Sequence, residues 1–165
     1  MKNITATQKG LITGIAMVAT SLLIYLSKGN FEGKLQYITY FLYLTGIVWA
    51  IRDLSKNVGP DEKFGSYFSA GFKCFIVVTL LMTVFTIVFL LMHPELKEQN
   101  SVLAREVLGK EKNRTPKEIE EKVQMAKESY NLIIIMSTVF WYLVVGAIVT
   151  LVSSAVLLQS KKNTD

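Results

Sequence analysis

Four long stretches of this chain contain no Lys, Arg, Asp or Glu, and this segregation of charge constrains the fold more than any other feature. The stretches are Gly10–Ser27, Leu35–Ile51, Cys74–Met92 and Ser129–Leu158. All 18 Lys and Arg residues and all 13 Asp and Glu residues lie elsewhere, although charged residues make up an ordinary 19% of the chain. A surface helix of a soluble protein needs a polar stripe, because one of its faces meets water. The pattern therefore excludes an ordinary soluble domain and predicts an integral membrane protein.

Each stretch is long enough to cross a bilayer as a helix. At 1.5 Å per residue, the three shorter stretches reach about 26 to 28 Å, close to the roughly 30 Å hydrocarbon layer. Helices are required because lipid cannot satisfy backbone N–H and C=O groups, and no stretch alternates like a barrel strand. We therefore predict an all-α fold, an integral membrane four-helix bundle with spans at about 10–27, 35–51, 72–92 and 132–158.

The first span is expected to be a retained helix. Lys2 and Lys9 resemble the basic start of a signal peptide, but the apolar stretch is too long and no A-x-A cleavage site follows it. Four spans place both termini on one side of the membrane. Slightly more Lys and Arg residues lie on the other side, but most of those are far along the chain from a helix end, so we expect cytoplasmic termini.

The hydrophilic segment between the third and fourth spans carries the signals of two helices. His93-Pro94 ends the third span, and Pro94–Leu108 has a helical pattern that stops at Gly109. Thr115-Pro-Lys-Glu118 is a capping box, which starts a helix that continues through the last span. We therefore predict a short extramembrane helical cap at 94–128 between helices 3 and 4, in which the first helix folds back on the start of the second.

The sequence supplies no set of residues for catalysis or metal binding. Ionisable groups inside a bilayer are costly unless they are functional, and none lies well inside the four stretches. His93 and Cys74 are the single histidine and the single cysteine, so a catalytic triad, a metal cluster and an internal disulfide cannot be assembled. We therefore expect no enzyme activity, no catalytic residue, no metal and no cofactor.

Two residues at helix ends are functional candidates. Lys73 precedes the third charge-free stretch, where it serves either as a snorkelling membrane anchor or as a functional charge paired with Asp53 or Asp61. His93 ends that stretch, where it either interacts with headgroups and last-turn carbonyls or senses pH or a ligand. Ser66 is predicted to be the N-cap of the third helix.

Three threonines share one face of the third helix at i, i+4 and i+7, namely Thr79, Thr83 and Thr86. Their hydroxyls either bond to backbone carbonyls while the helix packs, or line a polar path. Gly10-x-x-x-Gly14 in the first helix favours close helix packing, within one chain or in a dimer.

The formal net charge of +5 does not indicate nucleic-acid binding. The basic residues flank the apolar stretches, a placement that anionic headgroups and snorkelling favour. The expected partners are the lipid bilayer and either a protein partner or further copies of the chain.

The motifs around the third and fourth helices resemble a known family. The third helix is preceded by Phe64-Gly and Phe68-x-x-Gly71-Phe72 and followed by Pro94, and a Glu-rich segment at Thr115–Met125 leads into a last helix that contains glycine. With the four spans, these features are similar to the small bacterial membrane proteins grouped as domain of unknown function 4199, over roughly residues 8–160. The resemblance implies a helical bundle in the inner (cytoplasmic) membrane of Bacteroidetes-type bacteria. It carries no established activity, so no catalytic residue is transferred.

The leading hypothesis is an uncharacterised, non-enzymatic integral membrane protein that acts as a scaffold or accessory subunit. Its interaction surface would be the 93–128 segment, the one sizeable hydrophilic element. The alternative hypothesis is a small oligomeric transporter or channel, in which Thr79, Thr83 and Thr86 face a shared path.

Overall fold

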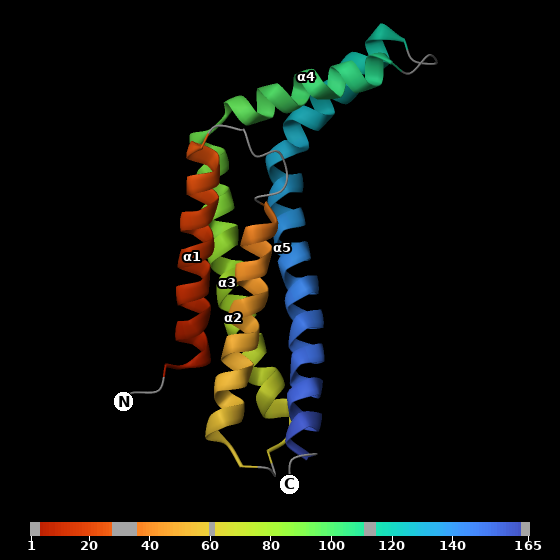
Figure 1. Ribbon diagram of the computed structural model, residues 1–165. Helices are drawn as coiled ribbons and strands as arrows, with labels where there is room; N and C mark the ends of the chain where they lie inside the picture. The colour runs from red at the N-terminus through yellow and green to blue at the C-terminus, as the bar shows by residue number, and fades with distance from the viewer. Residues whose placement is uncertain (1–3, 28–35, 60–61, 111–114, 163–165) are drawn as a thin grey trace. The chain divides into compact units, whose positions relative to one another are not determined.

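The computed structural model describes residues 4–27, 36–59, 62–110 and 115–162, and these residues form five α-helices and no strand. The predicted all-α class is thereby confirmed. The predicted link at 28–34 and Asp61 lie outside the described residues. The helices, shown in Figure 1, are α1 (Ala6–Leu26), α2 (Gln36–Asn57), α3 (Phe64–Met92), α4 (Glu95–Gly109) and α5 (Pro116–Lys162).

Three of these helices, α1, α3 and α5, are long and apolar enough to cross a membrane. The sequence predicted four spans, and the helix that differs is α2. Its apolar stretch is diluted by Tyr37, Tyr40 and Tyr43, and its last turns carry Arg52 and Asp53. The aromatic rings make α2 less apolar by composition without adding charge to its middle.

The described chain divides into two compact units. The first comprises residues 1–82 and 139–165, and the second comprises residues 83–138. α3 and α5 therefore each contribute to both units. Within the first unit, α1 and α2 run in opposite directions beside each other (Figure 1).

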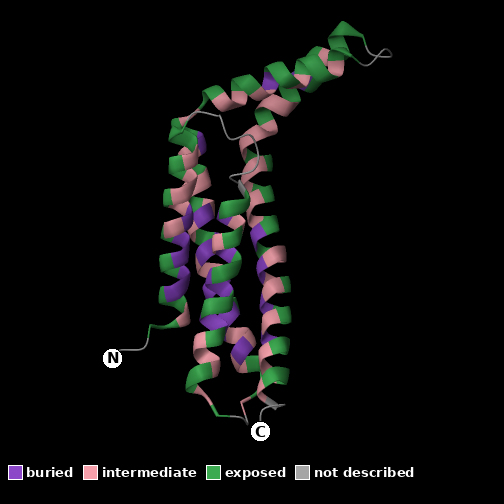
Figure 2. Ribbon diagram, viewed as in Figure 1, coloured by how far each residue is buried: buried purple, intermediate pink, exposed green. Residues whose placement is uncertain are grey.

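Small residues bring the helices of the first unit into close contact. The buried face of α1 consists of Lys9, Gly10, Thr13, Gly14 and Met17, which recur at the spacing of one helix face. A Cβ atom on Gly10 would lie 2.6 Å from the carbonyl oxygen of Cys74 in α3, so glycine is needed for this approach. Figure 2 shows that the buried residues of α1, α2 and α3 gather on their facing sides.

The last part of α5 packs against α2 and α3 through polar and aromatic contacts. The hydroxyl of Tyr43 in α2 donates a 2.7 Å hydrogen bond to the carbonyl of Tyr142, and the two rings meet edge to face at 5.2 Å. Gly146 lies one turn after Tyr142, and a Cβ atom there would lie 2.7 Å from the ring of Phe75. At the end of the helix, Lys161 Nζ donates to the carbonyl of Ser55, at 2.9 Å, and to that of Val58. This lysine thus satisfies carbonyls at the C-terminal end of α2.

In the second unit, α4 packs against the first turns of α5. Lys127 Nζ lies 2.5 Å from Glu98 Oε1, and Arg105 Nη2 contacts both carboxylate oxygens of Glu120 at 2.6 and 2.7 Å. Val123 of α5 is only 4% exposed and lies in the core of this hairpin.

The boundaries of α4 and α5 agree with the sequence signals. α4 ends at Gly109, the predicted stop. The Thr115 N–H donates to Glu118 Oε2 at 2.8 Å, and the Glu118 N–H donates to Thr115 Oγ1 at 3.4 Å, so the capping box is formed. The predicted N-cap of the third helix was wrong, because α3 begins at Phe64 and Ser66 lies in its first turn, where it donates to the Glu62 carboxylate.

Candidate functional site

A buried ion pair joins α1 to α2 near one end of the first unit. Lys9 Nζ contacts Asp53 Oδ2, and the lysine side chain is only 4% exposed whereas the aspartate is 36% exposed. The ammonium group also lies 5.6 Å from the centre of the Trp49 ring, within range of a cation–π contact. A lysine buried to this extent would be costly without a partner.

The sequence did not reveal this pair, because Lys9 reads as one more basic residue flanking an apolar stretch. One of the two interpretations of Lys73 paired it with Asp53 or Asp61, and the structure pairs Asp53 with Lys9 instead. The available signal was Gly10-x-x-x-Gly14, which begins directly after Lys9 and marks a helix face that packs closely.

Lys73 instead borders a groove with both polar and apolar walls, formed by the start of α1, the end of α2 and the start of α3. This Lys73 groove has a volume of about 660 Å³. Thr5, Thr7, Ser66 and Ser69 contribute hydroxyls to its lining, and Leu54 contributes an apolar wall. The Lys73 side chain is exposed, and no carboxylate of the described residues lies within 4.0 Å of its ammonium group.

The three threonines of α3 differ in burial. Thr79 is 4% exposed and donates a 2.8 Å hydrogen bond to the carbonyl of Phe75, one turn earlier in the helix. This bond is the backbone bonding expected of a packed helix. Thr83 and Thr86 are half-buried and belong to the second unit.

His93 forms a local contact at the junction of α3 and α4. Its Nδ1 atom lies 2.7 Å from Glu95 Oε1, and its ring packs on Phe89 with centroids 4.5 Å apart. The pKa of Glu95 is lowered, first because its carboxylate accepts its own backbone N–H and then because of His93. The sequence analysis considered headgroups and last-turn carbonyls as neighbours of His93, and the structure adds the Glu95 carboxylate.

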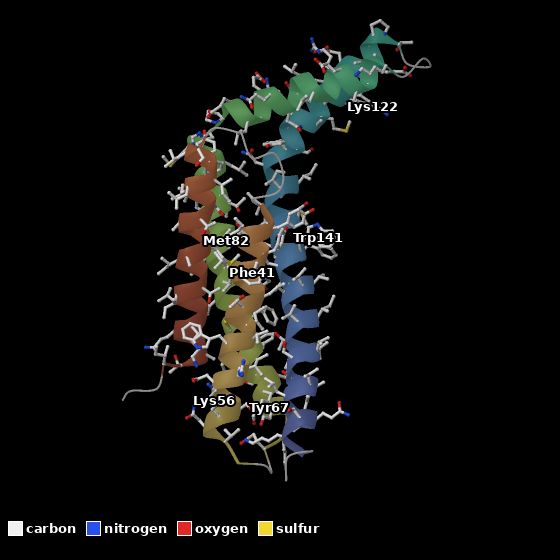
Figure 3. All side chains as sticks on the ribbon, viewed as in Figure 1. Phe41, Lys56, Tyr67, Met82, Lys122 and Trp141 are labelled. Atoms are coloured by element: carbon white, nitrogen blue, oxygen red, sulfur yellow. The ribbon has the colours of Figure 1, made fainter. Side chains whose placement is uncertain are left out.

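Three buried hydroxyls in the first unit have no hydrogen-bond partner among the described residues. They belong to Tyr67 of α3 and to Thr150 and Ser154 of α5, each with a side chain that is not exposed. Thr150 packs on α3, since a Cβ atom on Gly71 would lie 2.6 Å from its Cγ2 atom. Figure 3 labels Tyr67 near the N-terminal end of α3. Nothing in the charge pattern of the sequence singled out these residues.

The α4–α5 hairpin leaves large apolar side chains exposed. Leu103 and Val107 lie one turn apart on α4 and are 60% and 62% exposed, and Val102 beside them is 58% exposed. Met125 of α5 is 65% exposed. We call Leu103 and Val107, which share one face of α4, the cap surface.

Met125 also borders a groove of about 600 Å³ along the start of α5. Glu120, Glu121 and Glu128 line it, with Lys117 and Gln124. The lining carries three acidic groups and one basic group, so the groove has a net negative charge.

The described residues contain no group of three or more His, Cys, Asp or Glu side chains arranged to hold a metal ion.

Comparison with known families matches residues 8–159 to a family described as "Protein of unknown function (DUF4199)". The match covers most of the chain and confirms the resemblance drawn from the motifs around α3 and α5. No curated protein and no solved structure matches the chain.

Proposed function

This chain belongs to the DUF4199 family of proteins of unknown function, and from that premise we propose that it is a non-enzymatic membrane protein that crosses the bilayer four times and binds a protein partner through the α4–α5 hairpin. It would act as a scaffold or accessory subunit in the inner membrane of a bacterium. The observation that carries the proposed binding role is the exposed apolar cap surface.

Four crossings require α2 to span the membrane along with α1, α3 and α5. Its 22 residues reach about 33 Å, which exceeds the roughly 30 Å hydrocarbon layer. The contact between Lys9 and Asp53 joins the start of α1 to the end of α2, so α2 returns to the level at which α1 begins. A helix that runs antiparallel to a membrane span and matches its length is best placed as a span itself.

The orientation follows from the basic residues near the helix ends. Arg52, Lys56 and Lys73 are exposed and lie close to the ends of apolar stretches, on the side of the termini. Basic residues so placed favour the cytoplasm. We therefore propose cytoplasmic termini, with the 93–128 segment emerging on the opposite side.

The cap surface is suited to a protein partner because its side chains are apolar. A helix pair whose outer face met only water would not need apolar side chains at these positions. Exposed apolar clusters rimmed by polar residues mark interaction sites on soluble surfaces. Leu103 and Val107 are exposed on one face of α4, whereas Arg105, about half a turn around the helix, is paired with Glu120. The acidic groove beside Met125 favours a partner that combines apolar side chains with basic ones.

The experiment compares partners that co-purify with the tagged full chain in mild detergent. Leu103→Ala combined with Val107→Ala should weaken partner binding about thirtyfold, because truncating a central anchor costs about 1 kcal/mol and two anchors are removed. Gln99→Ala is the matched control, since it truncates an exposed polar side chain on the same helix. It should leave binding within about twofold.

Two results would refute the proposed role. One is a chain that purifies as a monomer without partner from its native membrane. The other is a double variant that retains the partner in full. If a differently tagged copy of the chain is the sole species that co-purifies, the partner is a second copy of this chain and not a different protein.

A further inference from the structure

The Lys73 groove has the composition of an anion site. It collects hydroxyls from two helices, Thr5 and Thr7 of the α1 start and Ser69 of α3, beside one cationic side chain. Thr5 Oγ1 accepts the N–H of Gln8 at 3.3 Å, so its own O–H remains a donor. Ser66 already donates to Glu62. Three residues with a free hydroxyl donor and one lysine therefore line a common space.

Among the lining residues of the groove the charge comes from Lys73, and the Glu62 carboxylate beside the groove accepts the Ser66 hydroxyl. The nearby Lys9 is neutralised by Asp53, whereas no described carboxylate lies within ion-pair distance of Lys73. The first turns of α1 and α3 also contain no acidic residue. Thr5 accepts the Gln8 N–H and the Lys63 carbonyl accepts the Ser66 N–H, and the helix dipoles add a partial positive charge at both helix starts.

The position of the groove along α3 indicates which anion it meets. Lys73 directly precedes the charge-free stretch Cys74–Met92, and α3 is long and apolar enough to cross a membrane. The ammonium group thus lies at the boundary of the apolar stretch, where phospholipid headgroups are found. Leu54 and Ala70 supply apolar walls, against which the carbon atoms of a lipid can pack.

We propose that the Lys73 groove binds a phosphate group, carried by the headgroup of an anionic phospholipid. Lys73 forms the charge-assisted contact to the phosphate oxygens, and the hydroxyls of Thr5, Thr7 and Ser69 donate to the remaining oxygens. The inference rests on α3 crossing the membrane but not on the cap surface. Its test is therefore independent of the test of the proposed partner.

The test measures lipid binding to the full chain in detergent by native mass spectrometry. Dioleoyl phosphatidylglycerol is titrated in one series and dioleoyl phosphatidylcholine in another. The wild-type chain should retain phosphatidylglycerol in preference to phosphatidylcholine. Lys73→Gln should weaken that binding about tenfold, the usual effect of losing one charge-assisted contact.

Lys56→Gln is the matched control, because Lys56 is an exposed lysine at the end of α2 that does not line the groove (Figure 3). It should change binding less than about twofold. Lys73→Arg should retain the preference, and Ser69→Ala should weaken it without removing a charge. These two variants keep the test valid if Lys73→Gln does not fold.

A further arm adds inorganic phosphate at millimolar concentration during the titration. Failure to displace the lipid supports a lipid headgroup as the source of the phosphate, and full displacement would overturn that source in favour of a soluble phosphate compound. Equal weakening by Lys73→Gln and Lys56→Gln would refute the site, since binding would then follow general surface charge. Equal retention of the anionic and zwitterionic lipids would also refute it.

Discussion

Lys9 and Asp53 join the first turn of α1 to the last turns of α2, and the lysine is buried with its ammonium group against the carboxylate. Because the two residues lie at opposite ends of their own helices, their contact fixes α1 and α2 as antiparallel neighbours of matched length. Lys161, near the end of α5, donates to the carbonyls of Ser55 and Val58, so α5 ends beside the end of α2. Lys9 and Lys161 therefore hold three helix ends together. In the sequence, both look like ordinary basic residues that flank a membrane span.

Asp53→Asn should destabilise the protein, because it leaves the buried Lys9 charge without a partner. Removing one member of a buried pair commonly costs about 3–5 kcal/mol, and the partial exposure of Asp53 reduces the expected loss to about 2 kcal/mol. The free energy of unfolding is measured in mixed micelles. Lys9→Met combined with Asp53→Leu should recover part of the loss, and Arg52→Gln, next to the pair, should change stability by less than about 0.5 kcal/mol. If Asp53→Asn lowered the free energy of unfolding no more than Arg52→Gln does, the ion pair would contribute nothing to stability.

Gly46→Ala should weaken the packing of α2 on α1. A Cβ atom on Gly46 would overlap the side chain of Thr13, and overpacking of this kind costs about 1–3 kcal/mol. Thr13→Ala in the same chain should restore most of the stability. Gly65→Ala is the control, since a Cβ atom there meets nothing within 4 Å, and it should raise stability slightly through helix propensity. Equal melting temperatures for both alanine variants would contradict this packing.

The local signals in the sequence were enough to predict the helix boundaries of the cap. The capping box at Thr115 and the stop at Gly109 depend on side chains within a few residues, so they could be read without knowing the fold. The N-cap at Ser66 failed because Glu62, four residues earlier, offers its carboxylate and the helix starts before the serine.

The site residues were harder to predict because their contacts depend on the register between helices. Lys9 meets Asp53 across 44 positions, and Tyr43 meets Tyr142 across 99. A charge pattern shows that these residues lie near a helix end or within an apolar stretch. It does not show which neighbouring helix each one faces.

Thr150→Val should stabilise the first unit. The Thr150 hydroxyl is fully buried and has no partner among the described residues, and an apolar group of the same shape removes its desolvation cost, a gain of about 1 kcal/mol. Thr79→Val is the matched control on α3, where the hydroxyl bonds to Phe75, and it should be neutral or slightly destabilising. The comparison is made by thermal unfolding in detergent. A loss of stability in Thr150→Val would mean that its hydroxyl is hydrogen-bonded in the protein.

The packing of α4 on α5 should loosen in acid. The pKa of Glu98 is lowered, chiefly by its hydrogen bond from Lys127. A carboxyl group with a lowered pKa in the folded state stabilises it fully above the ordinary glutamate pKa, and this contribution is lost as the pH falls through the lowered value. The protection factors of the α4 amides, which correct for the intrinsic slowing of exchange in acid, should therefore fall in that acidic range, by less than about fivefold for such an exposed pair. Glu98→Gln should exchange faster at neutral pH and respond less to acid, and an unchanged acid response would contradict the role of Glu98.

The number of membrane crossings is the central claim, and cysteine accessibility tests it most directly. In a Cys74→Ala background, single cysteines are introduced at Ile4 and Lys110, both exposed, and labelled with an impermeant maleimide in intact cells and after lysis. Four crossings place the two positions on opposite sides, so Lys110→Cys should label in intact cells and Ile4→Cys only after lysis. If α2 does not cross, the two positions share one side, and labelling of both under the same condition would contradict the account.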